Sequence, residues 1–192
     1  PEKLTNRMFN HQKEGILWLY KLHMSTKHHG GILGDDMGLG KTFQTVSLLT
    51  TLYNKKLINT TLIICPVSVL QSWSRELTEH LLPYVMPSPS SSSSSSSGGH
   101  QGHKDNKHIS INLITGEMGK SKRLKILNDI KTKIYYKGNK RPAIVITSYH
   151  LLSNMIDEFV NDDIGSGNGS NNGKWMWDYV ILDEGHLIKN PS

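Results

Sequence analysis

The sequence predicts an α/β fold in which a parallel β-sheet is covered by helices on both faces. Short, continuous apolar runs alternate with amphipathic helical patterns, as expected for strands that are buried on both sides. A glycine-containing loop at residues 36–42 directly precedes one helical pattern, and an acidic pair, Asp183 and Glu184, directly follows the last apolar run. With 192 residues, the chain is long enough for one domain with a substantial core.

The elements are expected in alternating order along the chain. An amphipathic helix over residues 10–23 comes first, and the short apolar run 31–34 reads as a strand that enters the glycine loop. The helix that leaves this loop covers residues 43–53, because its apolar residues recur at helical spacing. The strand 61–65 and a helix over about 69–82 follow.

The second half repeats this alternation. A strand at 109–114 precedes a basic helix over about 120–132, whose leucine and isoleucine residues share one face. The strand 143–147 leads into a helix whose apolar residues are Leu151, Leu152, Met155, Ile156 and Phe159. The strand 179–182 is the last element before the acidic pair.

Two low-complexity stretches interrupt the pattern between elements. Residues 87–107 contain an unbroken serine run from Ser90 to Ser97, and residues 161–174 are rich in asparagine, glycine and serine. Neither stretch has the apolar side chains needed to form part of a core. We expect both to be surface loop insertions, the serine-rich one disordered, which a fold tolerates between elements.

The loop at residues 36–42 has the composition of a phosphate-binding loop. Gly38 and Gly40 allow the backbone N–H groups to approach a phosphate closely, and they precede a helix N-terminus that favours anions. Lys41 supplies a positive charge for the phosphates, and the Thr42 hydroxyl can bind Mg²⁺. The strict pattern has glycine where this chain has Asp35. A chance occurrence is the alternative, but strand, loop and helix in this order make it improbable.

The acidic pair has the position of a metal and water site. Ligands of parallel α/β sheets bind at the C-terminal ends of the strands, where Asp183 and Glu184 are expected. An aspartate there can hold Mg²⁺, and a neighbouring glutamate can deprotonate an attacking water. Taken alone, the pair would read as a solvated turn; the loop around Lys41 favours the metal site.

Charge is distributed unevenly. The chain carries a net charge of +6. Residues 104–141 alone hold nine lysines and two arginines against three acidic residues, a charge of 11 − 3 = +8, and the rest of the chain carries 6 − 8 = −2. Such a patch suits a polyanion such as DNA, although a solvated helix face explains the charge alone equally well. No apolar run approaches the length of a membrane span, so no membrane partner is expected. The single cysteine, Cys65, excludes an internal disulfide and fits a packed thiol in a reducing compartment.

These residues together resemble the signature motifs of the Swi/Snf-type ATPases, DNA translocases of helicase superfamily 2. The first motif reads Asp36, Met37, Gly38, Leu39, Gly40, Lys41 and Thr42, and the second reads Asp183, Glu184, Gly185 and His186. Further matches occur in family order: Gln12 in the Gln motif, Pro66, Val67 and Ser68 in motif Ia, and Thr147, Ser148 and Tyr149 in motif Ib. Within the family, the chain looks most similar to excision-repair proteins of the Cockayne syndrome B type.

The resemblance implies a RecA-like lobe that binds ATP and Mg²⁺. It implies that residues 36–42 bind the nucleotide, that Lys41, Asp183 and Glu184 act in catalysis, and that Thr42 and Asp183 hold the metal. Gln12 would read adenine, and His186 would couple the site to a second RecA-like lobe. The residues quoted for motifs Ia and Ib would contact the DNA backbone, which positions the protein without reading sequence.

The function expected from the resemblance is a DNA-dependent ATPase that translocates on double-stranded DNA in chromatin remodelling or repair, in the nucleus, with nucleosomes as a possible substrate. A P-loop kinase or metabolic ATPase explains the loop but not Gln12, Tyr149 or the basic region. A non-catalytic module of the same fold is the third possibility. Residues 1–192 match only part of the first lobe, so we expect them alone to hydrolyse ATP negligibly.

Overall fold

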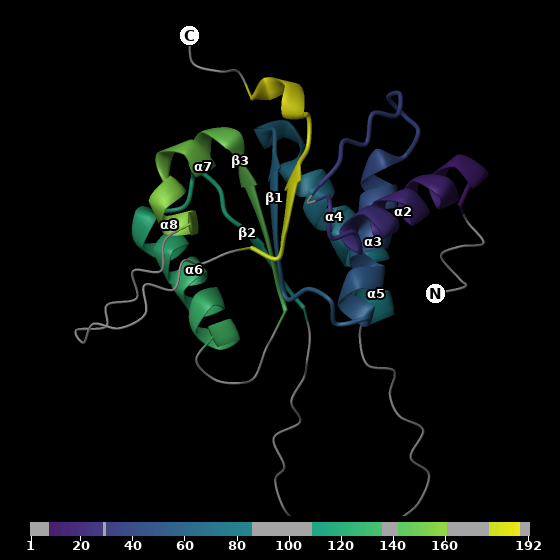
Figure 1. The fold of residues 1–192 in the computed structure, drawn as a ribbon. Coiled ribbons are helices and arrows are strands. Elements are labelled where there is room, and N and C mark those ends of the chain that lie inside the picture. Colours follow the sequence, from purple (N-terminus) through teal and green to yellow (C-terminus); the bar gives the residue numbers. More distant parts are fainter. Residues whose placement is uncertain (1–7, 29, 86–108, 136–141, 161–176, 189–192) are drawn as a thin grey trace, which may run out of the picture.

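The computed structural model describes residues 8–28, 30–85, 109–135, 142–160 and 177–188. Their centre is a four-stranded sheet in the order β2-β3-β1-β4, and all of its strand pairs are parallel (Figure 1). The strands are β1 (Thr60–Cys65), β2 (Ser110–Leu113), β3 (Ala143–Ser148) and β4 (Tyr179–Leu182). The predicted α/β class with a parallel sheet is therefore confirmed.

Helices cover both faces of the sheet, as predicted (Figure 1). One face carries α2 (Asn10–His23), α3 (Lys41–Asn54), α4 (Leu70–His80) and α5 (Leu82–Val85). The other carries α6 (Lys120–Tyr135), α7 (Tyr149–Asn154) and α8 (Ile156–Val160). Two 3₁₀ turns, η1 (Val67–Val69) and η2 (Gly185–Leu187), follow β1 and β4 at the C-terminal edge of the sheet.

The two central strands supply both halves of the core. β1 and β3 are buried along their whole lengths, so neither shows the alternating polarity of a half-exposed strand. Ile63 and Ile146 point into the cluster beneath α2, α3 and α4, whereas Ile64 and Val145 point into the cluster beneath α6, α7 and α8. The strands β1, β3 and β4 end at the same edge of the sheet, and this edge carries the candidate site.

The strand predicted at residues 31–34 is not formed. Among the described residues, this segment pairs with no strand, and the side chain of Ile32 is 90% exposed. A strand is stabilised by hydrogen bonds to a neighbour, and the nearest edge, that of β4, lies across an open cavity that both segments line. The apolar run is present in the sequence, but no described strand lies close enough to pair with it.

Two helix predictions were too long. The helix expected over 69–82 ends as α4 at His80, and α5 begins at Leu82 after a separate turn. The helix expected around Leu151 to Phe159 is divided into α7 and α8 at Met155, whose φ of −135° is not helical.

Several sequence expectations fall on other parts of the chain. The serine-rich stretch 87–107 and the asparagine- and glycine-rich stretch 161–174 lie outside the described residues, as do the ends of the basic region. No helix in the described ranges is both long and apolar enough to cross a bilayer.

Candidate nucleotide site

The glycine loop enters helix α3 in a conformation that only glycine adopts without cost. Gly38 has a φ of +87° and Gly40 a φ of +79°, both in the region that is unfavourable for residues with a Cβ atom. The first helical hydrogen bond runs from the Gln44 N–H to the Gly40 carbonyl. The N–H groups before it have no partner within the helix, and groups of this kind can bind an anion.

Helix α2 braces this loop through Gln12. The Gln12 Nε2 donates to the Leu39 carbonyl at 3.2 Å, and its Oε1 accepts from the Phe9 N–H at 3.2 Å. A Cβ atom at Gly40 would lie 2.6 Å from the Gln12 Nε2, so any other residue here would displace the Gln12 amide as well as strain the positive φ. Gln12 is buried and does not line the cavity described below. Its predicted contact with adenine stays a prediction.

The Lys41 ammonium group is folded back onto its own loop. Its Nζ donates to the Asp35 carbonyl at 2.7 Å and to the Asp36 carbonyl at 3.0 Å. Both acceptors are neutral carbonyl groups. Since a phosphate oxygen accepts a stronger, charge-assisted hydrogen bond, the same group can exchange them for a bound polyphosphate.

The structure explains why Asp35 is tolerated where the strict loop pattern has glycine. Asp35 is not among the residues with positive φ, so the backbone does not require glycine at this position. Its Oδ2 accepts a hydrogen bond of 2.9 Å from the Nε2 of Gln44, which is fully buried in α3. Gln44 therefore ties the start of the loop to the helix, a role that the sequence analysis missed.

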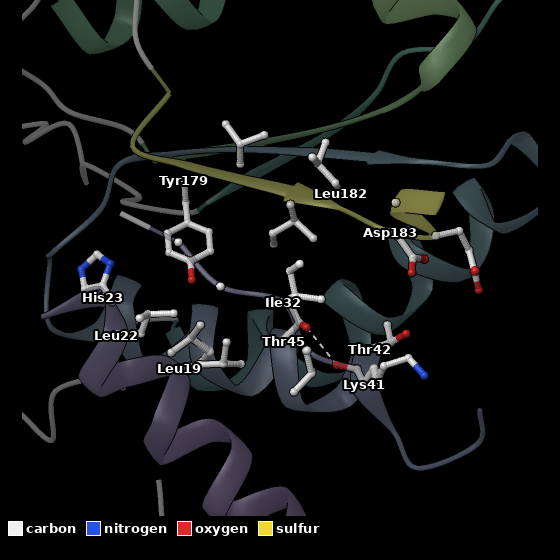
Figure 2. A pocket seen from close by; sticks show the side chains of 18 of the residues that line it. Leu19, Leu22, His23, Ile32, Lys41, Thr42, Thr45, Tyr179, Leu182 and Asp183 are labelled. Atoms are coloured by element: carbon white, nitrogen blue, oxygen red, sulfur yellow. Dashed lines mark hydrogen bonds between the residues drawn. The ribbon is translucent and has the colours of Figure 1, made fainter. Parts of the chain in front are cut away.

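A cavity of about 850 Å³ lies between the loop and β4 (Figure 2). Lys41, Thr42 and Thr45 from α3 form one wall, and Tyr179, Leu182 and Asp183 form the wall opposite (Figure 2). Glu184 and His186 also line it. The two motifs, which are far apart in the sequence, therefore meet around a single cavity.

The acidic pair occupies two different environments. Asp183 is half-buried, and its Oδ2 accepts a hydrogen bond of 2.7 Å from the Trp73 indole N–H. Glu184 is exposed and adopts a left-handed backbone conformation, with φ 53° and ψ 47°. Non-glycine residues in this conformation cost free energy and are concentrated at functional sites. The Glu184 Oε2 lies 3.2 Å from the His186 Nδ1, which brings the predicted coupling histidine to the predicted base.

Two ionisable neighbours of Asp183 stay protonated at neutral pH. Burial, with the nearby Asp183 carboxylate as a second cause, raises the pKa of the Cys65 thiol to about 12. The same two causes raise the pKa of the Tyr149 hydroxyl, burial again being the larger. Cys65 is fully buried, as expected for a packed thiol, and the Tyr149 hydroxyl remains a hydrogen-bond donor.

The residues predicted to contact DNA lie at the same edge of the sheet but differ in exposure. Val67 is 69% exposed and Ser68 is exposed, with Pro66 half-buried beside them. Thr147 is fully buried, and the Ser148 hydroxyl accepts from the Leu151 N–H as the N-cap of α7. The side chains of Thr147 and Ser148 are enclosed in the fold, and the contacts of these residues with the DNA backbone stay predictions.

The donor groups around the cavity fit a nucleotide triphosphate with Mg²⁺. Lys41 and the N-terminus of α3 supply positive charge and N–H donors for phosphates. Mg²⁺ usually keeps several waters and takes only one or two protein side chains besides substrate phosphates. The Thr42 hydroxyl and the Asp183 carboxylate, which face each other across the cavity, match that requirement (Figure 2).

A glycine loop at a helix N-terminus, facing an aspartate at the end of a parallel strand, is the arrangement of a P-loop nucleotide-binding domain. The family model of the SNF2-related domain matches residues 11–192. The chain therefore belongs to the SNF2 family.

Similar proteins fall into chromatin-remodelling and excision-repair groups. The chain is 33% identical over its whole length to Protein CHROMATIN REMODELING 24 of Arabidopsis thaliana, of which it covers 14%. It is 32% identical over its whole length to DNA excision repair protein ERCC-6-like of Bos taurus, covering 12% of it, and 30% identical to DNA excision repair protein CSB of Oryza sativa subsp. japonica, covering 15%. The chain thus spans a small part of each relative.

The fold is also that of a solved structure, the Sulfolobus solfataricus SWI2/SNF2 ATPase core in complex with dsDNA. The match has a TM-score of 0.57 at 23% sequence identity and covers 96% of this chain and 27% of that one. The RecA-like fold predicted from the motif resemblance is thereby confirmed.

Proposed function

We propose that this chain is part of the first, ATP-binding lobe of a DNA-dependent ATPase that translocates on double-stranded DNA. The observation that carries the proposal is the convergence of Lys41, Thr42 and Asp183 on one cavity in a chain of the SNF2 family. The relatives named for chromatin remodelling and excision repair support work on chromatin or damaged DNA, and therefore a nuclear location.

Each residue around the cavity has a distinct task in this proposal. The loop 36–42 binds the phosphates, and Lys41 exchanges the carbonyls of Asp35 and Asp36 for phosphate oxygens. Thr42 and Asp183 hold Mg²⁺, which neutralises charge that develops on the phosphates. Glu184, exposed beside the cavity, orients and deprotonates the attacking water, and His186 couples it to a second lobe.

The proposal includes a second RecA-like lobe of the same protein, which would supply an arginine to the cavity. No arginine is among the described residues that line it. In related NTPases an arginine finger contributes about 10³–10⁵ in rate. We therefore expect residues 1–192 alone to hydrolyse ATP negligibly, even with DNA present.

DNA is expected to bind at the C-terminal edge of the sheet. Pro66, Val67 and Ser68 contribute an exposed turn between β1 and α4, and Tyr149 begins the neighbouring helix α7. Contacts there would involve backbone N–H groups and the Ser68 hydroxyl with phosphates, which position the protein without reading sequence.

Duplex DNA is expected to stimulate the ATPase activity of the whole protein by at least about tenfold, regardless of base composition, since phosphate contacts carry no sequence information. The measurement is the steady-state ATPase rate with and without duplexes of contrasting sequence. Raising the salt concentration should reduce the stimulation, because the contacts are electrostatic. A rate that DNA leaves unchanged would instead favour a small-molecule P-loop ATPase or kinase.

A further inference from the structure

Asp183 is held by hydrogen bonds from three different elements. Its backbone N–H donates to the Ile64 carbonyl of β1 at 2.9 Å, which continues the sheet by one residue. Its own carbonyl accepts from the Tyr149 hydroxyl at 2.7 Å, and its carboxylate Oδ2 accepts from the Trp73 Nε1 at 2.7 Å. The first bond is ordinary sheet structure, whereas the two side-chain bonds are additional.

The bond from Trp73 fixes the orientation of the carboxylate. Trp73 is 3% exposed and packs in the core cluster with its α4 neighbours Leu70 and Leu77, so its ring cannot swing away. A short bond from a neutral N–H to an ionised carboxylate is charge-assisted and stronger than a neutral pair. Because Trp73 occupies Oδ2, it sets the rotation of the carboxylate and the direction in which Oδ1 is presented.

The bond from Tyr149 fixes the backbone beneath that carboxylate. Tyr149 is the first residue of α7, whose start is held by the Ser148 cap. Its hydroxyl reaches the carbonyl of Asp183, the point where β4 has ended and the chain turns into the left-handed Glu184. This hydrogen bond holds the peptide that joins Asp183 to Glu184, and so it influences the directions of both side chains.

We propose that Trp73 and Tyr149 are positioning residues that orient Asp183 for Mg²⁺. The inference rests on the proposed function, because it assumes that Asp183 is the metal carboxylate. Partners that hydrogen-bond to metal ligands fix ligand geometry, and their loss typically costs about 10–100-fold in metal affinity or activity. Trp73 and Tyr149 stand in that relation to Asp183, and α4, which carries Trp73, directly follows the exposed turn at residues 66–68.

The test uses substitutions that remove one donor and keep the ring. In the whole protein, Trp73→Phe removes the indole N–H and Tyr149→Phe removes the hydroxyl. The chain offers a matched control for each. Trp177→Phe removes an indole N–H that donates to the Phe159 carbonyl, and Tyr53→Phe removes a buried hydroxyl that bonds to Thr61, both away from Asp183.

The first readout is the free Mg²⁺ concentration that gives the half-maximal DNA-stimulated ATPase rate. We expect Trp73→Phe to raise it by about tenfold or more and Tyr149→Phe to raise it by a smaller factor, with recovery of rate at high Mg²⁺. The second readout needs no turnover: the gain in ADP affinity that Mg²⁺ confers should shrink in both variants, while ADP affinity without Mg²⁺ stays unchanged. Neither control should move either readout.

Circular dichroism first establishes that Trp73→Phe and Tyr149→Phe are folded. The inference is overturned if both folded variants then reach the half-maximal rate at the same Mg²⁺ concentration as the wild-type protein. It is equally overturned if the controls shift the midpoint as much, because the effect would then be one of general packing. Failure of the proposed function would appear differently, as a wild-type protein without DNA-stimulated ATPase activity.

Discussion

Replacing Lys41 by alanine in the whole protein is expected to abolish ATP hydrolysis and to weaken nucleotide binding strongly. The ammonium group has no role in packing, since it bonds only to the carbonyls of its own loop among the described contacts. Each hydrogen bond between charged groups is worth about 1.5–3 kcal/mol, so affinity should fall by about 10–150-fold. Turnover should fall by about 10²–10³-fold or more, because charge that develops on the phosphates loses a fixed partner.

The measurement pairs ATPase rates with binding of a fluorescent nucleotide. Lys55→Ala is a suitable control, because Lys55 lies at the other end of α3 and faces the ring of Tyr20 at 6.0 Å rather than the cavity. Normal nucleotide affinity in Lys41→Ala would contradict the assignment of the loop.

Replacing Glu184 by glutamine is expected to block turnover while ATP binding is preserved. Glutamine keeps the length of the side chain and can still bond to His186, but it cannot accept the proton of an attacking water. General base catalysis typically contributes about 10²–10⁴-fold, and we expect a loss in that range in the catalytic rate constant. The backbone cost of the left-handed conformation is the same for both residues, so the fold should be unaffected.

This variant separates binding from chemistry when it is measured in both assays. Glu79→Gln, an exposed position on α4, serves as the control for loss of one surface charge. An equal loss of nucleotide binding and of turnover in Glu184→Gln would refute the role of Glu184 as the base.

The loop and the acidic pair could be located from sequence because each depends on local chemistry. Gly38 and Gly40 adopt the positive φ angles that their residue type permits. Asp183 directly follows β4, which its run of apolar residues makes recognisable as a strand. The segment 31–34 shows the opposite case. Its composition suits a strand, but strand formation depends on a neighbour, which sequence pattern alone does not supply.

The contacts that organise the site were beyond sequence reasoning because they join distant residues. Trp73 fits the helical pattern as one more core residue, and nothing local indicates that its N–H meets a carboxylate 110 positions later. For Tyr149 the motif resemblance suggested only a contact with DNA, and it did not indicate that the hydroxyl bonds to the Asp183 carbonyl. The amide of Gln44, a long polar side chain among the buried residues of α3, was a signal that could have been followed, since buried polar groups need partners.

The proposed function requires that this lobe belongs to a motor that moves along duplex DNA. The most direct measurement is the ATP-dependent displacement of a third strand from a DNA triplex by the whole protein, with a forked duplex as the parallel substrate. We expect the wild-type protein to displace the third strand and to leave the strands of the forked duplex paired. In the Glu184→Gln variant we expect the third strand to stay bound as well. DNA-stimulated ATP hydrolysis without displacement of the third strand would contradict translocation along duplex DNA.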